Sequence, residues 1–184
     1  METALELFHK FYDPIKPVVF DKNEWAVIAI ATITEGSAIY IYAKHRIMRL
    51  SEGLALILFN VYLTSLLEFI LATRPVDLYD TIDRDSGELF DFPLELVSYP
   101  VAMYIAMHFF LSWKIKKRYF VLLVAPVLCA LEWICLRYFS LFTYKSWNLM
   151  LSFLFYIGVL TLNVNMISWI HHKVAANGGS KNVK

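Results

Sequence analysis

Four glutamates stand inside long apolar stretches of this chain, and their positions are where chemistry could take place. They are Glu35, Glu68, Glu95 and Glu132. An ionisable side chain within a membrane span is costly and normally faces the interior of a helix bundle or a water-filled cavity. At about 1.5 Å per helical residue, Glu35 falls near the midplane, whereas Glu132, Glu68 and Glu95 fall ~4–11 Å toward the outer side. Residues of this kind recur in proton and ion pathways.

A basic residue on the fourth apolar stretch offers one explanation for these glutamates. Arg137 falls ~12 Å toward the outer side by the same count, and it is five residues from Glu132, so the two point to different helix faces. Its natural partner is Glu95 or Glu68 on a neighbouring helix. With hydrogen bonds from nearby polar side chains, such a pair predicts a polar clamp that holds the helices together, because apolar contacts give little net attraction between helices in lipid. Those polar side chains are Asn60, Tyr99, Asn148 and Ser152.

The alternative is an outward-facing acidic cavity that binds a cation, a proton or a basic headgroup. One Arg–Glu pair accounts for only one glutamate, and Glu35 is the carboxylate that Arg137 reaches least easily. Small residues beside it (Ala29, Thr32 and Gly36) share one stripe of the same helix. Such a stripe allows close helix approach, so we expect Glu35 to face another helix of the chain rather than lipid.

The elements that must position these residues are five apolar runs, each long enough to cross a hydrocarbon core as a helix. Of the 184 residues, 59% are hydrophobic and 18% are charged, whereas a soluble domain has roughly a quarter charged. We therefore predict an all-α integral membrane bundle of five transmembrane helices that forms a single membrane domain over residues 1–184. The predicted spans are 25–42, 54–71, 92–113, 119–139 and 147–170.

The connecting segments differ in charge, and the difference predicts an orientation. Ten of the 17 Lys and Arg residues follow the first span, follow the third span or lie in the tail, and the strongest cluster is Lys114–Arg118. Loops rich in Lys and Arg stay in the cytoplasm. The N-terminus is therefore expected outside and the tail, 171–184, in the cytoplasm. Residues 1–24 are expected to lie on the outer membrane surface with a short helix that begins at a capping box on Thr3.

Several functional classes find no support in the sequence. The net charge of +1 gives no basic stripe for nucleic acid. The histidines His108, His171 and His172 lack the spacing of a metal or haem motif, and no nucleotide or nucleophile motif is present. We therefore expect no metal, no cofactor, no catalytic residue and no enzymatic activity.

A pattern after the fourth span is similar to a known family. It consists of Glu132 in an aromatic context followed by Tyr144-x-x-Trp147-x-x-x-x-Ser152-x-x-x-Tyr156. Together with Leu89-Phe90-Asp91 and Pro100, it resembles an uncharacterised family of small multi-pass membrane proteins from endospore-forming bacteria, over residues 22–172. Family members often carry a proline after this glutamate, where the chain has Trp133. The resemblance implies a five-span layout in the plasma membrane, and it implies no activity or site residues.

The sequence thus favours a structural or accessory subunit of the plasma membrane with a buried Glu/Arg polar cluster. Its expected partners are the lipid bilayer and other membrane proteins, with no nucleic acid. The alternative function is a small transporter or channel whose intramembrane glutamates, including Glu35, Glu68 and Glu132, bind protons or cations.

Overall fold

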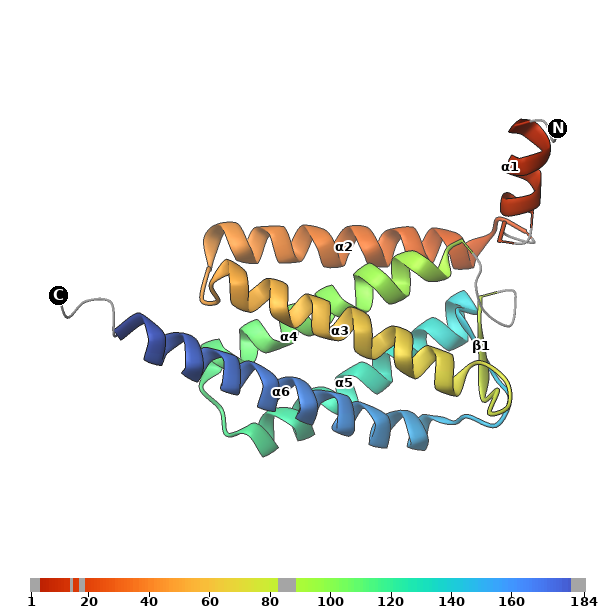
Figure 1. Ribbon diagram of the computed structural model, residues 1–184. Helices are drawn as coiled ribbons and strands as arrows, with labels where there is room; N and C mark the ends of the chain where they lie inside the picture. The colour runs from red at the N-terminus through yellow and green to blue at the C-terminus, as the bar shows by residue number, and fades with distance from the viewer. Residues whose placement is uncertain (1–3, 14, 17–18, 83–88, 180–184) are drawn as a thin grey trace.

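The computed structural model describes residues 4–13, 15–16, 19–82 and 89–179, and it is almost entirely helical (Figure 1). Two short strands and two π-helical segments interrupt the α-helices. In chain order the elements are α1 (Ala4–Tyr12), α2 (Lys22–Lys44), α3 (Leu50–Leu71), β1 (Tyr79–Thr81), η1 (Pro93–Ser98), α4 (Tyr99–Trp113), α5 (Lys117–Ile134), η2 (Cys135–Phe139), β2 (Phe142–Tyr144) and α6 (Leu149–Gly179).

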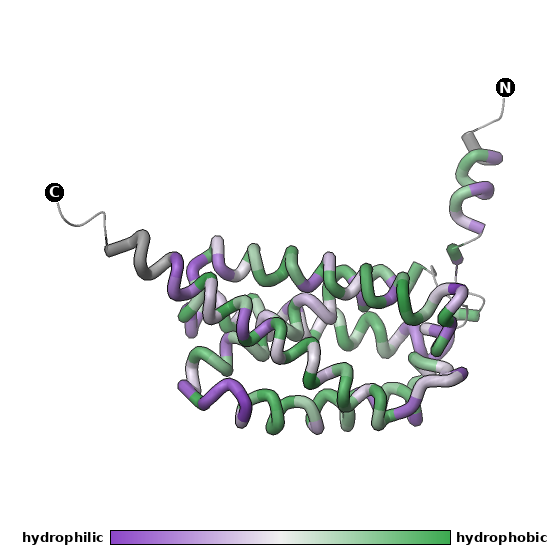
Figure 2. The backbone as a smooth tube through the Cα atoms, turned by 60° about the horizontal axis from the view of Figure 1, so that its bottom comes forward, coloured by the Kyte–Doolittle hydropathy of each residue, from purple (hydrophilic) through white to green (hydrophobic). Residues whose placement is uncertain are grey.

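Five of these helical segments are long and apolar enough to cross a membrane, as predicted. They cover Lys22–Lys44, Leu50–Leu71, Pro93–Trp113, Lys117–Phe139 and Leu149–Lys173, so each predicted boundary is within four residues of the observed one. Figure 2 shows hydrophobic residues along the length of the bundle and hydrophilic residues gathered toward its two ends. The all-α class is confirmed, and the five helices expected to have the length and composition of a membrane span are present.

The starts of α2 and α3 are fixed by the same local device. The first amides of a helix have no partner within it. The Asp21 side chain accepts a hydrogen bond from the Asn23 amide, and Glu24 Oε2 accepts one from the Asp21 amide at 2.7 Å. Glu52 Oε2 likewise accepts from the Arg49 amide at 2.7 Å. The predicted N-terminal helix exists as α1, whereas Thr3 of its predicted capping box lies outside the described residues.

The bundle has two distinct ends. At the strand end, β1 and β2 pair in antiparallel fashion, with Tyr79 opposite Tyr144 and Thr81 opposite Phe142. At the opposite end, which we call the tail end, α2 turns into α3 and α6 runs on to the C-terminus (Figure 1). The sequence predicted only loops where the two strands form.

The half of the bundle next to the tail end is closely packed. Large side chains from four helices meet there with almost no exposure, among them Leu56, Met107, Phe120 and Leu160. α3 approaches α4 so closely at Gly53 that an added Cβ would lie 3.1 Å from the ring of Tyr104, which explains a glycine at this position. We call this region the packed half.

The half next to the strand end is built differently. The first turn and a half of the third span is the π-helical segment η1, and the fourth span ends in the π-helical segment η2. π-Helical turns are rare and are frequently found at functional sites. The five spans enclose a cavity in this region, which we call the hollow half.

Candidate functional site: a cavity with two anchored glutamates

A cavity of about 310 Å³ occupies the centre of the hollow half, and both Glu68 and Glu132 line it. All five spans and both strands contribute to its wall. On α3 the lining residues run from Asn60 at the deepest point to Leu71 near the strand end. The structure therefore brings together two of the predicted site residues from spans that are far apart in the sequence.

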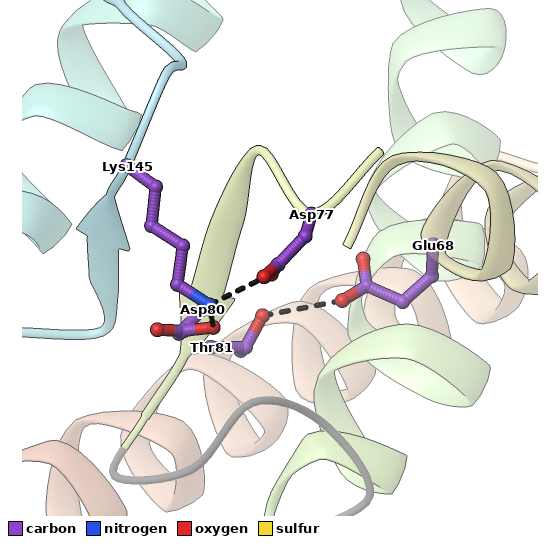
Figure 3. Close-up of polar contacts among 5 residues, drawn as sticks. All are labelled: Glu68, Asp77, Asp80, Thr81 and Lys145. Carbon is purple, nitrogen blue, oxygen red and sulfur yellow. Dashed lines mark hydrogen bonds and ion pairs between the residues drawn. The ribbon is translucent and has the colours of Figure 1, made fainter. Parts of the chain in front are cut away.

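Glu68 projects from α3 and is held by hydroxyl groups of β1. The Tyr79 hydroxyl donates a hydrogen bond to Glu68 Oε2 at 2.7 Å, and the Thr81 hydroxyl donates one to Oε1 at 3.3 Å. Figure 3 shows Glu68 and Thr81 pointing toward one another. Each carboxylate oxygen of Glu68 thus has a hydroxyl donor from the strand.

Glu132 projects from α5 and is held from β2 and α6. Its Oε1 accepts hydrogen bonds from the Tyr144 hydroxyl and from the Ser152 hydroxyl, the latter at 2.7 Å. Ser152 in turn accepts a hydrogen bond from Trp147 Nε1 at 2.7 Å. A continuous chain of donors therefore runs from the indole through the serine to the carboxylate.

The pairing of the two strands explains why both tyrosines reach the cavity. Directly opposed residues of an antiparallel pair project from the same face, and neighbours along a strand project from opposite faces. Tyr79 and Tyr144 are opposed and donate to Glu68 and Glu132 respectively. Asp80, between Tyr79 and Thr81, is directed to the other face. The strand pair, which we call the lid, thus places one tyrosine hydroxyl donor beside each of the two glutamates.

A lysine secures this lid from outside. Lys145 Nζ lies 2.7 Å from Asp77 Oδ1 and 2.5 Å from Asp80 Oδ1, as Figure 3 shows. Hydrogen bonds and charge attraction from these two aspartates raise the pKa of Lys145 above its usual value, so the ammonium stays charged well beyond neutral pH. The ion pairs join the loop before β1 and β1 itself to the end of β2.

The two lid tyrosines remain hydrogen-bond donors at physiological pH. Burial raises the pKa of Tyr79, and the neighbouring charge of Glu68 raises it further. Burial also raises the pKa of Tyr144, together with its hydrogen bond to Glu132. Neither phenol therefore ionises near neutral pH, and both hydroxyls can keep donating to the carboxylates.

Glu95 lines a second, smaller cavity and not the main one. This space of about 200 Å³ lies between α3 and the start of the third span, and Asp91 and Glu68 also line it. Glu68 is therefore common to both cavities. Glu95 belongs to the same acidic region of the bundle, as the sequence indicated, but it is separated from Glu132 by the wall that carries Glu68.

Arg137 does not take part in the predicted clamp. It lies on η2 with an exposed side chain, and among the described residues no ion pair or hydrogen bond joins it to Glu68, Glu95 or Glu132. A long basic side chain near a helix end gains more from reaching water than from burial. The Glu/Arg pairing expected from the sequence is thus replaced by tyrosine, threonine and serine hydroxyls.

Glu35 is also placed differently from the prediction. Its side chain is exposed on α2, and so are the small residues Ala29, Thr32 and Gly36. A Cβ added at Gly36 would meet nothing within 4 Å. The expectation that Glu35 faces another helix of this chain is therefore wrong. A stripe of small residues shows that a helix can be approached closely, but it does not say which molecule approaches it.

The other polar side chains considered in the sequence are spread over the bundle. Asn60 and Tyr99 line the cavity, and Asn148 accepts hydrogen bonds from the Met150 and Leu151 amides at the start of α6. The histidines lie in the packed half. Asn60 Nδ2 donates to Asn163 Oδ1 at 2.6 Å across α3 and α6, and His171 Nδ1 lies 3.0 Å from Glu52 Oε1. His108 is buried there and does not line the cavity of the glutamates. Within the described part of the chain, no group of three or more His, Cys, Asp or Glu residues could hold a metal ion.

Sequence reasoning missed Tyr79, Thr81 and Tyr144 as partners of the glutamates. Their signal is local and weak: Phe-Thr-Tyr consists of the aromatic and β-branched residues that favour strands, and Tyr-Asp-Thr has two such residues around an aspartate. Ser152 was expected to donate a hydrogen bond and does so. The identity of its acceptor depended on which faces of α5 and α6 meet.

Comparison with known proteins adds no family to this description. Neither models of known families, nor curated proteins, nor solved structures gave a match to the chain. The resemblance to small membrane proteins of endospore-forming bacteria therefore stays a prediction, and the function is argued from the cavity alone.

Proposed function

We propose that the chain is a multi-pass membrane protein that holds a cation or a proton in the cavity between Glu68 and Glu132, as a small transporter or channel would. One observation carries this proposal. Two carboxylates fixed by hydroxyl donors line one cavity, and none of the described residues lining that cavity is Lys, Arg or His.

The cavity is a poorly solvated space for charge. An ionised carboxylate removed from water is costly unless it is paired or fully hydrogen-bonded. Hydroxyl donors offset part of that cost and fix the position of the oxygens, but they supply no positive charge. A bound proton or cation supplies it. Intramembrane carboxylates with this exposure to a cavity are typical of substrate and ion pathways.

A flux measurement in proteoliposomes tests the proposal. The purified protein is reconstituted, and proton movement and rubidium uptake are followed against protein-free vesicles. We expect Glu68→Gln and Glu132→Gln each to lower flux at least tenfold. Glu35→Gln is the matched control, because Glu35 is a glutamate on another apolar helix that lies outside the cavity. Equal flux in wild type and both cavity variants, together with the absence of any proton or cation binding by wild type, would contradict the proposal.

The proposal includes the plasma membrane as the location, with the N-terminus and the strand end outside and the tail in the cytoplasm. The distribution of Lys and Arg supports it. Single cysteines at Ser146 and at Lys116, in a background without Cys129 and Cys135, test the orientation on intact cells. A membrane-impermeant maleimide should label Ser146→Cys but not Lys116→Cys. The reverse pattern would invert the orientation.

A second candidate, an accessory subunit that binds another membrane protein, is favoured by the exposed Glu35. A carboxylate facing lipid is costly, and contact with a neighbouring protein through the small residues of α2 would remove it from lipid. A photo-crosslinking residue at Thr32 should then capture one defined protein in native membranes. The same crosslinker at Leu58, which is 67% exposed on α3, is the control. Identical adducts from both positions would count against a specific partner.

A further inference from the structure

The wall of the cavity contains a continuous series of aromatic rings. Phe142 packs against Tyr79 with ring centroids 6.5 Å apart, and Tyr79 packs against Trp147 at 5.8 Å. Trp147 packs against Phe155, and Phe155 against Tyr156, each at 5.9 Å. All five residues line the cavity. The series thus follows one side of the cavity from the lid into α6.

Both glutamates are attached to this aromatic wall. Glu68 accepts a hydrogen bond from Tyr79, and Glu132 accepts one from Ser152, which is itself bonded to the indole of Trp147. Electron-rich ring faces attract cations, and rings grouped around a site are the usual means of recognising quaternary ammonium groups. The cavity therefore combines two carboxyl side chains with aromatic surfaces in one place.

Most of the remaining lining surface is apolar, which argues against a bare inorganic cation. Calcium and magnesium are held by about six or more oxygen ligands. Seven leucines line this cavity instead: Leu63, Leu67, Leu71, Leu94, Leu128, Leu131 and Leu141. The volume of about 310 Å³ is at the lower limit of the 300–1,000 Å³ usual for small-molecule sites. It has room for a compact organic molecule, and its leucines would leave a bare ion poorly solvated.

We propose that the cavity binds an organic ammonium ion with an apolar body. The ammonium group lies between the aromatic wall and the two carboxylates, and the apolar body lies among the leucines. This inference rests on the proposed function, since it names the class of cation held there. A free organic cation and the ammonium headgroup of a membrane lipid share this chemistry.

Binding to the full chain in nanodiscs of phosphatidylglycerol tests the inference. The probe is benzyltrimethylammonium, and its matched control is neopentylbenzene, which has the same shape but a carbon atom in place of the charged nitrogen. Empty nanodiscs give the partition into lipid. We expect saturable binding of the ammonium probe, by calorimetry, and at least tenfold weaker binding of the neutral isostere. Equal binding of the two compounds would overturn the inference.

Variants test whether binding of the probe depends on the two glutamates and on the aromatic wall. Glu68→Gln and Glu132→Gln should each weaken binding of the probe about tenfold, whereas neither should affect the neutral compound. Trp147→Leu should weaken probe binding several-fold. Trp133→Leu is its control, since Trp133 lies on α5 outside the cavity lining. Folding of each variant is checked by its helical circular dichroism and its elution in detergent. Loss of probe binding in Trp133→Leu to the same degree as in Trp147→Leu would overturn the role of the aromatic wall.

Two further comparisons complete the test. One distinguishes failure of this inference from failure of the proposed function, and the other distinguishes a free cation from a lipid headgroup. If rubidium or protons bind and the organic probe does not, the inference is overturned while the proposed function stands. If no cation binds, both are overturned. In nanodiscs of phosphatidylcholine, an apparent affinity for the probe lower than in nanodiscs of an uncharged glycolipid shows that a lipid headgroup competes for the site, because neither membrane carries a net charge that attracts the probe. An unchanged affinity shows that the site takes a free cation.

Discussion

The two halves of this bundle use the same five helices for different purposes. In the packed half, side chains such as Met107 and Phe120 fill the space between the helices completely. In the hollow half, π-helical segments and a two-stranded lid surround a cavity. Close packing is the main source of attraction between helices in lipid, so the hollow half gives up part of that attraction. We infer that the packed half supplies stability and the hollow half supplies function.

The polar side chains differ in the same way. In the packed half they satisfy one another, as Glu52 does with His171. In the hollow half, Glu68 and Glu132 receive hydroxyl donors but no basic partner from the lining. The difference indicates that the charge in the hollow half is completed by something other than the chain itself.

The largest expected effect comes from truncating a ring in the packed half. Phe120 is fully buried against Phe110 and Trp113, so Phe120→Ala should lower the free energy of unfolding by about 3 kcal/mol. The same kind of truncation at Leu63, which lines the cavity and is not part of the packed cluster, should cost about 1 kcal/mol or less because it enlarges existing space. Reversible unfolding in bicelles measures both. Equal losses at the two positions would remove the distinction between the halves.

A smaller change in the free energy of unfolding is expected when a small side chain is enlarged. Ala125 is completely buried in the packed half, and Ala125→Leu should cost about 1–3 kcal/mol through overpacking. Ala102 lines the cavity, so Ala102→Leu should leave the unfolding free energy unchanged while it weakens binding of benzyltrimethylammonium. The free energy of unfolding and the affinity for benzyltrimethylammonium are measured on the same samples of both variants. A destabilised Ala102→Leu protein would show that the hollow half is packed after all.

The smallest change in the free energy of unfolding is expected from a tyrosine of the lid, and the pH range in which it is present follows from the pKa of that tyrosine. Removing one hydroxyl donor with Tyr144→Phe should cost about 1 kcal/mol of unfolding free energy. Because the pKa of Tyr144 is raised above its ordinary value of 10, the protonated phenol is favoured in the folded state. Its contribution is therefore complete below pH 10 and is lost only as pH rises through the higher folded value.

The difference between wild type and Tyr144→Phe should accordingly be the same at pH 7 and at pH 9. Unfolding measured at both values checks this, with Tyr138→Phe as a control for an exposed tyrosine on η2. A difference that disappears by pH 9 would show that the hydroxyl is not held by Glu132.

Features that depend only on the residues of a single segment could be predicted from the sequence. Long apolar runs specify spans regardless of what surrounds them, and the predicted boundaries are therefore close to the observed ones. The sequence placed Glu68 and Glu132 in the same, outer half of the spans by counting residues along each helix, and in the structure both line one cavity.

Features that depend on rotation of one helix against another could not be predicted. Glu35 and the stripe around it satisfy the pattern of a helix contact, but α2 packs against its neighbours through Val27, Ile30 and Thr34 on another face. The lid was missed for a related reason. Three-residue strands are too short to show alternation, and their pairing joins segments more than sixty residues apart. Only the assembled bundle brings Tyr79 and Tyr144 to the two glutamates.

The central claim is that the hollow half contains an accessible, negatively charged cavity, and cysteine labelling tests it most directly. Single cysteines at Ala102 and at Met107 are compared on the same helix, in a background without Cys129 and Cys135. The trimethylammonium reagent MTSET is used beside a neutral methanethiosulfonate. We predict that Ala102→Cys reacts and Met107→Cys does not, and that Glu132→Gln slows only the cationic reagent at Ala102→Cys. Protection of Ala102→Cys equal to that of Met107→Cys, or equal rates for both reagents, would contradict the account.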